Sequence, residues 1–173
     1  RMRVRPGSRI IEAGAGRGSF THASVRAVYN GVGEGGKVFS FEFHEDRVEA
    51  LKKEIGEHGL EGVVDVTARD VCLRGFTLDA QQTRSDKADL GGADANTTVE
   101  NIDASAVFLD LPAPWLAIPH LTRRSPANPT GPLSPYRTVH ICCFSPRMEQ
   151  SLRTISTLRS HNYTEIDLVE VQH

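Results

Sequence analysis

Short apolar runs alternate with amphipathic segments along most of the chain. The runs are typical of buried strands, and the segments place apolar residues at helical spacing, as Val48, Leu51 and Ile55 do. Strands are therefore expected at Arg9–Glu12, Lys37–Glu42, Val63–Ala68, Ala106–Asp110, Thr138–Phe144 and Glu165–Val171, and helices at Ser19–Val28, Asp46–Glu57 and Met148–Arg159. This alternation predicts an α/β fold with a doubly wound, mostly parallel sheet and helices on both faces.

Two segments break the pattern. Residues 78–103 are polar and lack periodicity, and residues 123–135 contain four prolines, so both are predicted to be irregular insertions. The remaining pattern indicates one domain over residues 1–173. Because the sequence stops just after the sixth expected strand, a final strand and a flanking domain are expected to lie outside it.

An acidic residue stands at or just beyond the end of each of the first four expected strands. These residues are Glu12, Glu42, Asp70 and Asp110. Ligands of open α/β sheets bind outside the carboxyl ends of the strands, so the four carboxylates are predicted to line one site.

The first strand leads into a turn with three alternate glycines, from Gly14 to Gly18. Ser19 stands where the dinucleotide fingerprint has its third glycine, and no G-K-[ST] ending follows, which disfavours nicotinamide and phosphate-loop ligands. The carboxylate of Glu12 suits a cationic ligand, such as a sulfonium amino acid. The backbone amides at the start of the helix and the Ser19 hydroxyl suit the carboxylate of that amino acid. A tight turn without ligand remains the alternative.

The other acids extend this hypothesis to a nucleoside. Glu42 is placed to accept both ribose hydroxyls, and Asp70 with the N–H of Val71 is placed at an adenine. An ion pair of Asp70 with Arg69 or Arg74 is the alternative. Together these positions predict S-adenosylmethionine as the cofactor.

Composition narrows the class of protein. A hydrophobic share of 39%, a net charge of −2 and short apolar runs indicate a globular domain without general attraction for a polyanion. Two groups of arginines are candidates for phosphate contacts or for a solvated surface: Arg1, Arg3, Arg5 and Arg9 near the start, and Arg123, Arg124 and Arg137 around the proline-rich segment. Three cysteines and the absence of a signal-peptide core predict an intracellular, unsecreted protein with reduced thiols. No membrane contact is expected. No metal site is expected either, because His44 and His120 lack partners at metal-ligand spacing.

Four blocks resemble one family, and they occur in its order: Phe41–His44, Arg69–Cys72, Val107–Trp115 and Phe144–Gln150. The chain resembles the catalytic subunit of eukaryotic tRNA (adenine-58-N1)-methyltransferase. The resemblance implies a Rossmann-like class I methyltransferase fold and methyl transfer from S-adenosylmethionine to N1 of an adenine in the tRNA T-loop, with S-adenosylhomocysteine as the product. It also implies a non-catalytic paralogous partner subunit, a heterotetramer and a nuclear location.

The resemblance assigns roles by position. The family's cofactor loop is matched by Gly14, Gly16, Arg17, Gly18 and Ser19. Its ribose-binding acid is matched by Glu42, and the arginine five residues later by Arg47. Asp70 and Val71 match the pair at the adenine, and Asp110 matches the catalytic aspartate. Three positions depart from the family pattern: Ala15 and Arg17 replace the commoner Thr and Ser, and Arg147 replaces a usual Cys.

The expected chemistry centres on Asp110. Methylation of N1 leaves positive charge on the base, which a carboxylate at the exocyclic amino group stabilises, by hydrogen bonding or by receiving its proton. Trp115 is expected to pack in the core rather than stack on a base. Two other functions are weighed against this enzyme: a non-catalytic RNA-binding or scaffolding subunit of the same fold, and a nicotinamide-dependent oxidoreductase.

Overall fold

A single parallel sheet forms the centre of the molecule. The computed structural model describes residues 2–16, 18–31, 35–78 and 100–170. The strands are β1 (Arg9–Ala13), β2 (Lys37–Glu42), β3 (Val64–Ala68), β4 (Ala106–Leu109) and β5 (His140–Cys143), in the order β3-β2-β1-β4-β5 with every neighbouring pair parallel. The predicted fold class is confirmed, and each of these strands begins and ends within two residues of its expected bounds.

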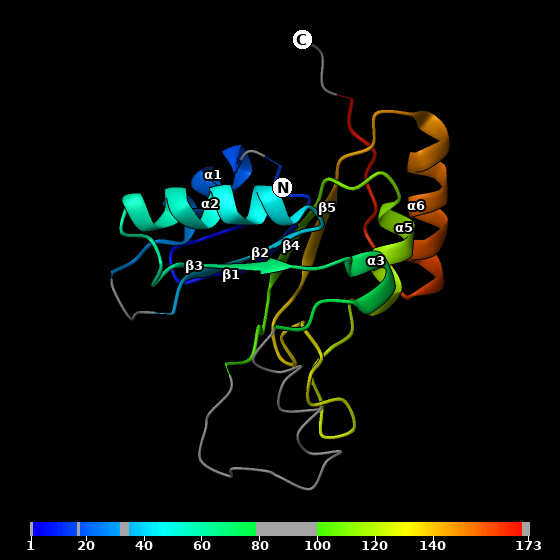
Figure 1. Cartoon of the computed structure of the whole chain (residues 1–173). Helices are drawn as coiled ribbons and strands as arrows, with labels where there is room; N and C mark the ends of the chain where they lie inside the picture. Colours follow the sequence, from blue (N-terminus) through cyan, green and yellow to red (C-terminus); the bar gives the residue numbers. More distant parts are fainter. Residues whose placement is uncertain (1, 17, 32–34, 79–99, 171–173) are drawn as a thin grey trace, which may run out of the picture.

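Helices cover both faces of this sheet (Figure 1). One layer contains α1 (Ser19–Val28) and α2 (Glu45–Glu57). The other layer contains α3 (Val71–Arg74), α5 (Pro114–Ala117), the 3-10 helix η1 (Ile118–His120) and α6 (Met148–Ser160). The three long helices were expected, whereas α3, α5 and η1 are too short to produce a recognisable period.

Alternate residues of each strand supply two separate cores. Ile10 of β1 and Val38 of β2 are paired in register and pack on the side of α1 and α2. Ile11 and Phe39, the next pair, pack on the side of α3 and α5. Since both faces are covered, the strands have nearly continuous apolar sequences rather than alternating ones.

The sixth expected strand, Glu165–Val171, is wrong for its described part. Residues 165–170 form no strand and pair with no described strand. Glu165 adopts a positive φ of 54°, which interrupts an extended run, and Leu168 and Val169 are exposed. Apolar residues predicted the strand, but without a neighbour their backbone groups gain no ladder hydrogen bonds. Val171 lies outside the described residues.

The two irregular segments have different outcomes. Residues 79–99 lie outside the described residues; Leu78 and residues 100–103 at the limits of the first segment form no helix or strand, and Leu78 and Ile102 are buried in the core. Residues 123–135 contain only isolated bridges, such as Arg123 with Leu133, as their prolines predicted. Among the described helices, none is both long and apolar enough to span a membrane.

Candidate functional site

The glycine turn joins β1 to α1 at the carboxyl edge of the sheet. Gly14, Gly16 and Gly18 have φ values of 84°, 56° and 78°, a region that favours glycine. A Cβ on Gly14 would lie 2.0 Å from the carbonyl oxygen of Asp110, so only glycine allows this approach. Ser19 is the exposed first residue of α1, and Arg17 lies outside the described residues.

Glu42, the last residue of β2, is hydrogen-bonded to this turn. Its Oε2 accepts a hydrogen bond from the N–H of Gly16 at 3.0 Å, and its Oε1 accepts one from the N–H of His44 at 3.1 Å. The guanidinium of Arg47 lies 3.9 Å from the same Oε1, and Glu42 is only 4% exposed. Each carboxylate oxygen has lone-pair capacity beyond these bonds, so the group remains able to accept from two hydroxyls.

Glu12 lies beneath the turn with no exposed surface. Its Oε2 accepts hydrogen bonds from the hydroxyls of Thr21 at 2.6 Å and Ser40 at 3.1 Å, which link α1 and β2 to β1. Its Oε1 is buried and has no hydrogen-bond partner among the described residues. Burial raises the pKa of this carboxyl above its ordinary value despite the hydroxyl donors. Glu12 therefore holds elements together, and its contact with a cationic ligand stays a prediction.

Asp70 caps the short helix α3. Its Oδ1 accepts from the N–H groups of Cys72 at 2.9 Å and Leu73 at 3.3 Å, a capping arrangement that neither expectation for Asp70 included. Val71 follows as the buried first residue of α3. The pair therefore lies just beyond the end of β3, as expected, with one Asp70 oxygen used for capping.

Asp110 directly follows β4 and is exposed. Its N–H donates to the carbonyl of Ala13 at 2.9 Å, which places it beside the glycine turn. The loop beyond it is attached to α6, because the Gln150 side-chain amide donates to the carbonyl of Pro112 at 3.0 Å.

Trp115 does not join the hydrophobic core. It is half-buried, outside both core clusters, and the guanidinium of Arg153 on α6 lies 5.5 Å from its ring centroid. The expectation of core packing is wrong, because α5 presents the indole to α6 rather than to the sheet.

The whole chain, residues 1–173, matches the family described as tRNA methyltransferase complex GCD14 subunit. The chain belongs to this family. It is 50% identical over 183 residues to the tRNA (adenine(58)-N(1))-methyltransferase catalytic subunit of Aspergillus fumigatus, covering 100% of this chain and 33% of that protein. It is 43% identical to the corresponding subunit of Candida albicans, covering 99% of this chain and 42% of that protein. The chain thus spans about a third to two fifths of the length of these curated relatives.

Solved structures agree on the fold. A SAM-dependent O-methyltransferase from Thermotoga maritima superposes with a TM-score of 0.59 at 24% identity, covering 92% of this chain and 46% of that one. A SAM-dependent methyltransferase from Aquifex aeolicus gives 0.57 at 14% identity, covering 92% and 73%. This GCD14-family chain therefore has the Rossmann-like methyltransferase fold.

Three of the arginines considered for phosphate binding have side chains engaged within the chain. Arg9 donates from Nε to the carbonyl of Ile102 at 2.7 Å, and Arg123 donates to that of Ser134 at 2.6 Å. Arg124 forms a two-point ion pair with Asp103, at 2.7 and 3.0 Å. These side chains fix irregular segments, a role that their sequence positions did not indicate.

The cysteines and one cavity of the GCD14-family chain are further candidate sites of chemistry. The three cysteines are free and half-buried, and burial raises their thiol pKa values, that of Cys143 to about 12. They are therefore protonated at neutral pH and unsuited as nucleophiles. A cavity of about 580 Å³ lies along the outer edge of β3, and no described residue expected to hold a cofactor lines it.

Proposed function

We infer that this chain is the S-adenosylmethionine-binding catalytic domain of a tRNA (adenine-58-N1)-methyltransferase. One observation carries the inference: the strand order β3-β2-β1-β4 sets Asp70, Glu42, the glycine turn and Asp110 in a row along one edge. In this order, Asp70 suits the adenine of S-adenosylmethionine, Glu42 its ribose and the glycine turn its amino-acid group. Asp110 then lies where the methyl-accepting base would bind. Family membership and the catalytic-subunit relatives support it.

The residues present fit the proposed cofactor. Glu42 has both oxygens directed at N–H donors beside the glycine turn, where they also suit ribose hydroxyls. A Cβ on Gly16 would meet no atom nearer than 3.9 Å, so space remains against the turn. Ser19 at the start of α1 and the helix amides suit a carboxylate, and Arg47 flanks Glu42. When bound, S-adenosylmethionine supplies an electrophilic methyl group.

Asp110 performs the part of the reaction assigned to this chain. The adenine N1 uses its own lone pair for the new bond, so alignment of the base is the main requirement. Exposed Asp110 accepts a hydrogen bond from the exocyclic amino group, which orients N1 and stabilises the positive charge developing on the base. The target adenine must be unpaired or extruded, since N1 lies on its pairing edge.

The partners follow from the family and from charge. A net charge of −2 gives no long-range attraction for tRNA. We propose that a paralogous non-catalytic subunit, in a heterotetramer, supplies much of the tRNA contact. A nuclear location is proposed from the resemblance to the eukaryotic family, and imaging of a fluorescent fusion tests it.

The first experiment measures labelled methyl transfer to unmodified tRNA by the chain together with its partner subunit. We expect N1-methyladenosine in the T-loop with wild type, loss of product with Asp110→Ala, and no change with Glu49→Ala, an exposed acid on α2. Full activity of Asp110→Ala would refute the assigned role. Cofactor binding without any methylation would favour the non-catalytic subunit.

A separate titration tests the cofactor site. Wild type is expected to bind S-adenosylmethionine saturably and nicotinamide cofactors not at all. Glu42→Ala should abolish binding, because the ribose then has no carboxylate acceptor and the turn loses the Gly16 hydrogen bond. Equal affinity in Glu42→Ala would overturn the proposed ribose site.

A further inference from the structure

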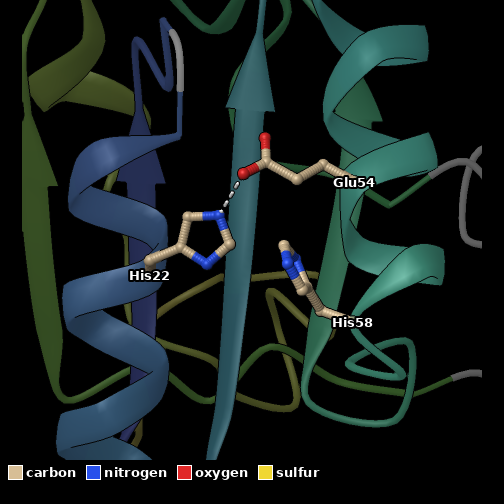
Figure 2. A group of neighbouring side chains, drawn as sticks. All are labelled: His22, Glu54 and His58. Atoms are coloured by element: carbon tan, nitrogen blue, oxygen red, sulfur yellow. Dashed lines mark hydrogen bonds and ion pairs between the residues drawn. The ribbon is translucent and has the colours of Figure 1, made fainter.

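Three side chains with metal-binding atoms converge between α1 and α2, and none of them belongs to the proposed cofactor site. Figure 2 shows His22 extending from α1 toward Glu54 and His58, which lie near the end of α2. One ligand atom from each of the three lies within 4.8 Å of the other two. Glu54 and His58 are four residues apart, so they share one side of the helix.

The three side chains lie close together, but their contacts with one another leave ligand atoms free. His22 Nε2 and Glu54 Oε1 are 2.8 Å apart, and the rings of His22 and His58 meet edge to face with centroids 5.7 Å apart. Within the described part of the chain, the His58 imidazole makes no hydrogen bond. The hydrogen bond between His22 and Glu54 does not involve His58, so both nitrogens of the His58 ring remain available to an ion.

We propose that His22, Glu54 and His58 bind a divalent transition-metal ion of the zinc type. Two imidazoles and a carboxylate are a ligand set that zinc accepts, with water in a fourth position. Bonds of about 2.0 to 2.1 Å place tetrahedral ligands roughly 3.3 Å apart, a separation that lies between the 2.8 Å contact and the 4.8 Å limit.

Exposure and position suit such a site. The side chains of His22 and Glu54 are 25% and 41% exposed and His58 is exposed, so an ion and its water have access. The backbone N–H of His22 donates to the carbonyl of Gly18, the last glycine of the cofactor turn. A bound ion would thus fasten the start of α1 to α2 and steady that turn. This departs from the expectation of no metal, which had considered only His44 and His120.

The test uses metal-free protein without a histidine tag, titrated with Zn²⁺ and separately with Co²⁺. We expect one saturable site, visible Co²⁺ absorption of a tetrahedral centre, no thiolate charge-transfer band, and a higher melting temperature with Zn²⁺. His58→Ala and Glu54→Gln should each weaken binding by about 10-fold or more. His161→Ala, an exposed histidine at the end of α6, is the matched control and should bind as wild type does.

Several outcomes would overturn the proposal: no saturable binding by wild type, unchanged affinity in both site variants, or a sulfur charge-transfer band that points to the cysteines. Glu54→Gln retains a hydrogen-bond acceptor for His22, so it separates metal binding from helix packing. S-adenosylmethionine affinity, measured on His58→Ala and on wild type, distinguishes failure of this site from failure of the proposed enzyme function.

Discussion

Gly14 lies against the backbone carbonyl of Asp110, where the glycine turn meets the loop that holds the proposed catalytic carboxylate. We expect Gly14→Ala to be strongly destabilising and to abolish S-adenosylmethionine binding. Its φ of 84° disfavours a side chain, and its Cβ would overlap the Asp110 oxygen at 2.0 Å. Denaturant unfolding and cofactor titration of the variant measure both effects.

Gly16→Ala is the matched comparison for this prediction. Its φ of 56° carries the same left-handed strain, roughly 1 to 2 kcal/mol, but its Cβ would meet only an atom 3.9 Å away. Equal losses in the two variants would show that strain, rather than the contact with Asp110, explains the glycine at position 14.

Glu12 makes a second prediction at the scale of the residue. Burial raises the pKa of Glu12 in the folded state above its ordinary value of 4.5. As the pH rises, the Glu12 carboxyl therefore ionises in the unfolded chain before it ionises in the folded one. The free energy of unfolding accordingly falls as the pH rises from about 4.5 through the raised pKa. Glu12→Gln cannot ionise and still accepts from Thr21. The unfolding free energy of the variant minus that of wild type should therefore be larger at about pH 8 than at about pH 4. Urea unfolding at both pH values measures this, and a constant difference would contradict it.

At the scale of the element, Asp70 combines a capping role with a proposed adenine contact. Asp70→Ala removes the acceptor for the N–H groups of Cys72 and Leu73 and should cost about 1 kcal/mol of unfolding free energy. Asp70→Asn keeps an oxygen for the cap and should restore stability, but its amide replaces a carboxylate acceptor and should weaken S-adenosylmethionine binding. Thermal unfolding and titration separate the roles; full cofactor affinity in Asp70→Asn would exclude the adenine contact.

The helices show which elements a sequence pattern reveals. The α1, α2 and α6 helices are long enough to repeat apolar residues at helical spacing, and they were predicted within one residue at each end. The short α3 depends instead on one cap, Asp70, and on packing against the core through Val71. The segment after Glu165 has strand-like residues but pairs with no strand in the described part of the chain, and pairing is a tertiary requirement.

At the scale of the whole molecule, Glu100 joins residues that lie far apart in the sequence. It forms ion pairs with Lys37 and, at 2.8 Å, with Arg9 at the start of β1. Partial burial raises the Glu100 pKa, but hydrogen bonds and charge from Lys37 and Arg9 outweigh this, so its pKa is lowered below 4.5. The pairs therefore connect the end of the first irregular segment to two neighbouring strands.

This lowered pKa gives a pH-dependent prediction. The stabilisation by Glu100 is complete above its unfolded pKa near 4.5 and is lost as the pH falls through the lower folded value. Glu100→Gln should therefore be less stable than wild type at neutral pH, with the difference vanishing in acid and shrinking in high salt. Chemical unfolding across this range measures the effect. A difference that persists in acid would mean that packing, not charge, is responsible.

The sequence by itself determined the fold class and the carboxylates of the proposed site. Buried strands and amphipathic helices have local periods, and parallel strands necessarily bring their carboxyl ends to one edge. Only the tertiary structure decided what each side chain contacts: Glu12 lies fully beneath the turn, and Trp115 packs toward α6. It alone brought His22 to Glu54 and His58, because contacts between helices depend on how the layers pack, which spacing along the chain does not encode.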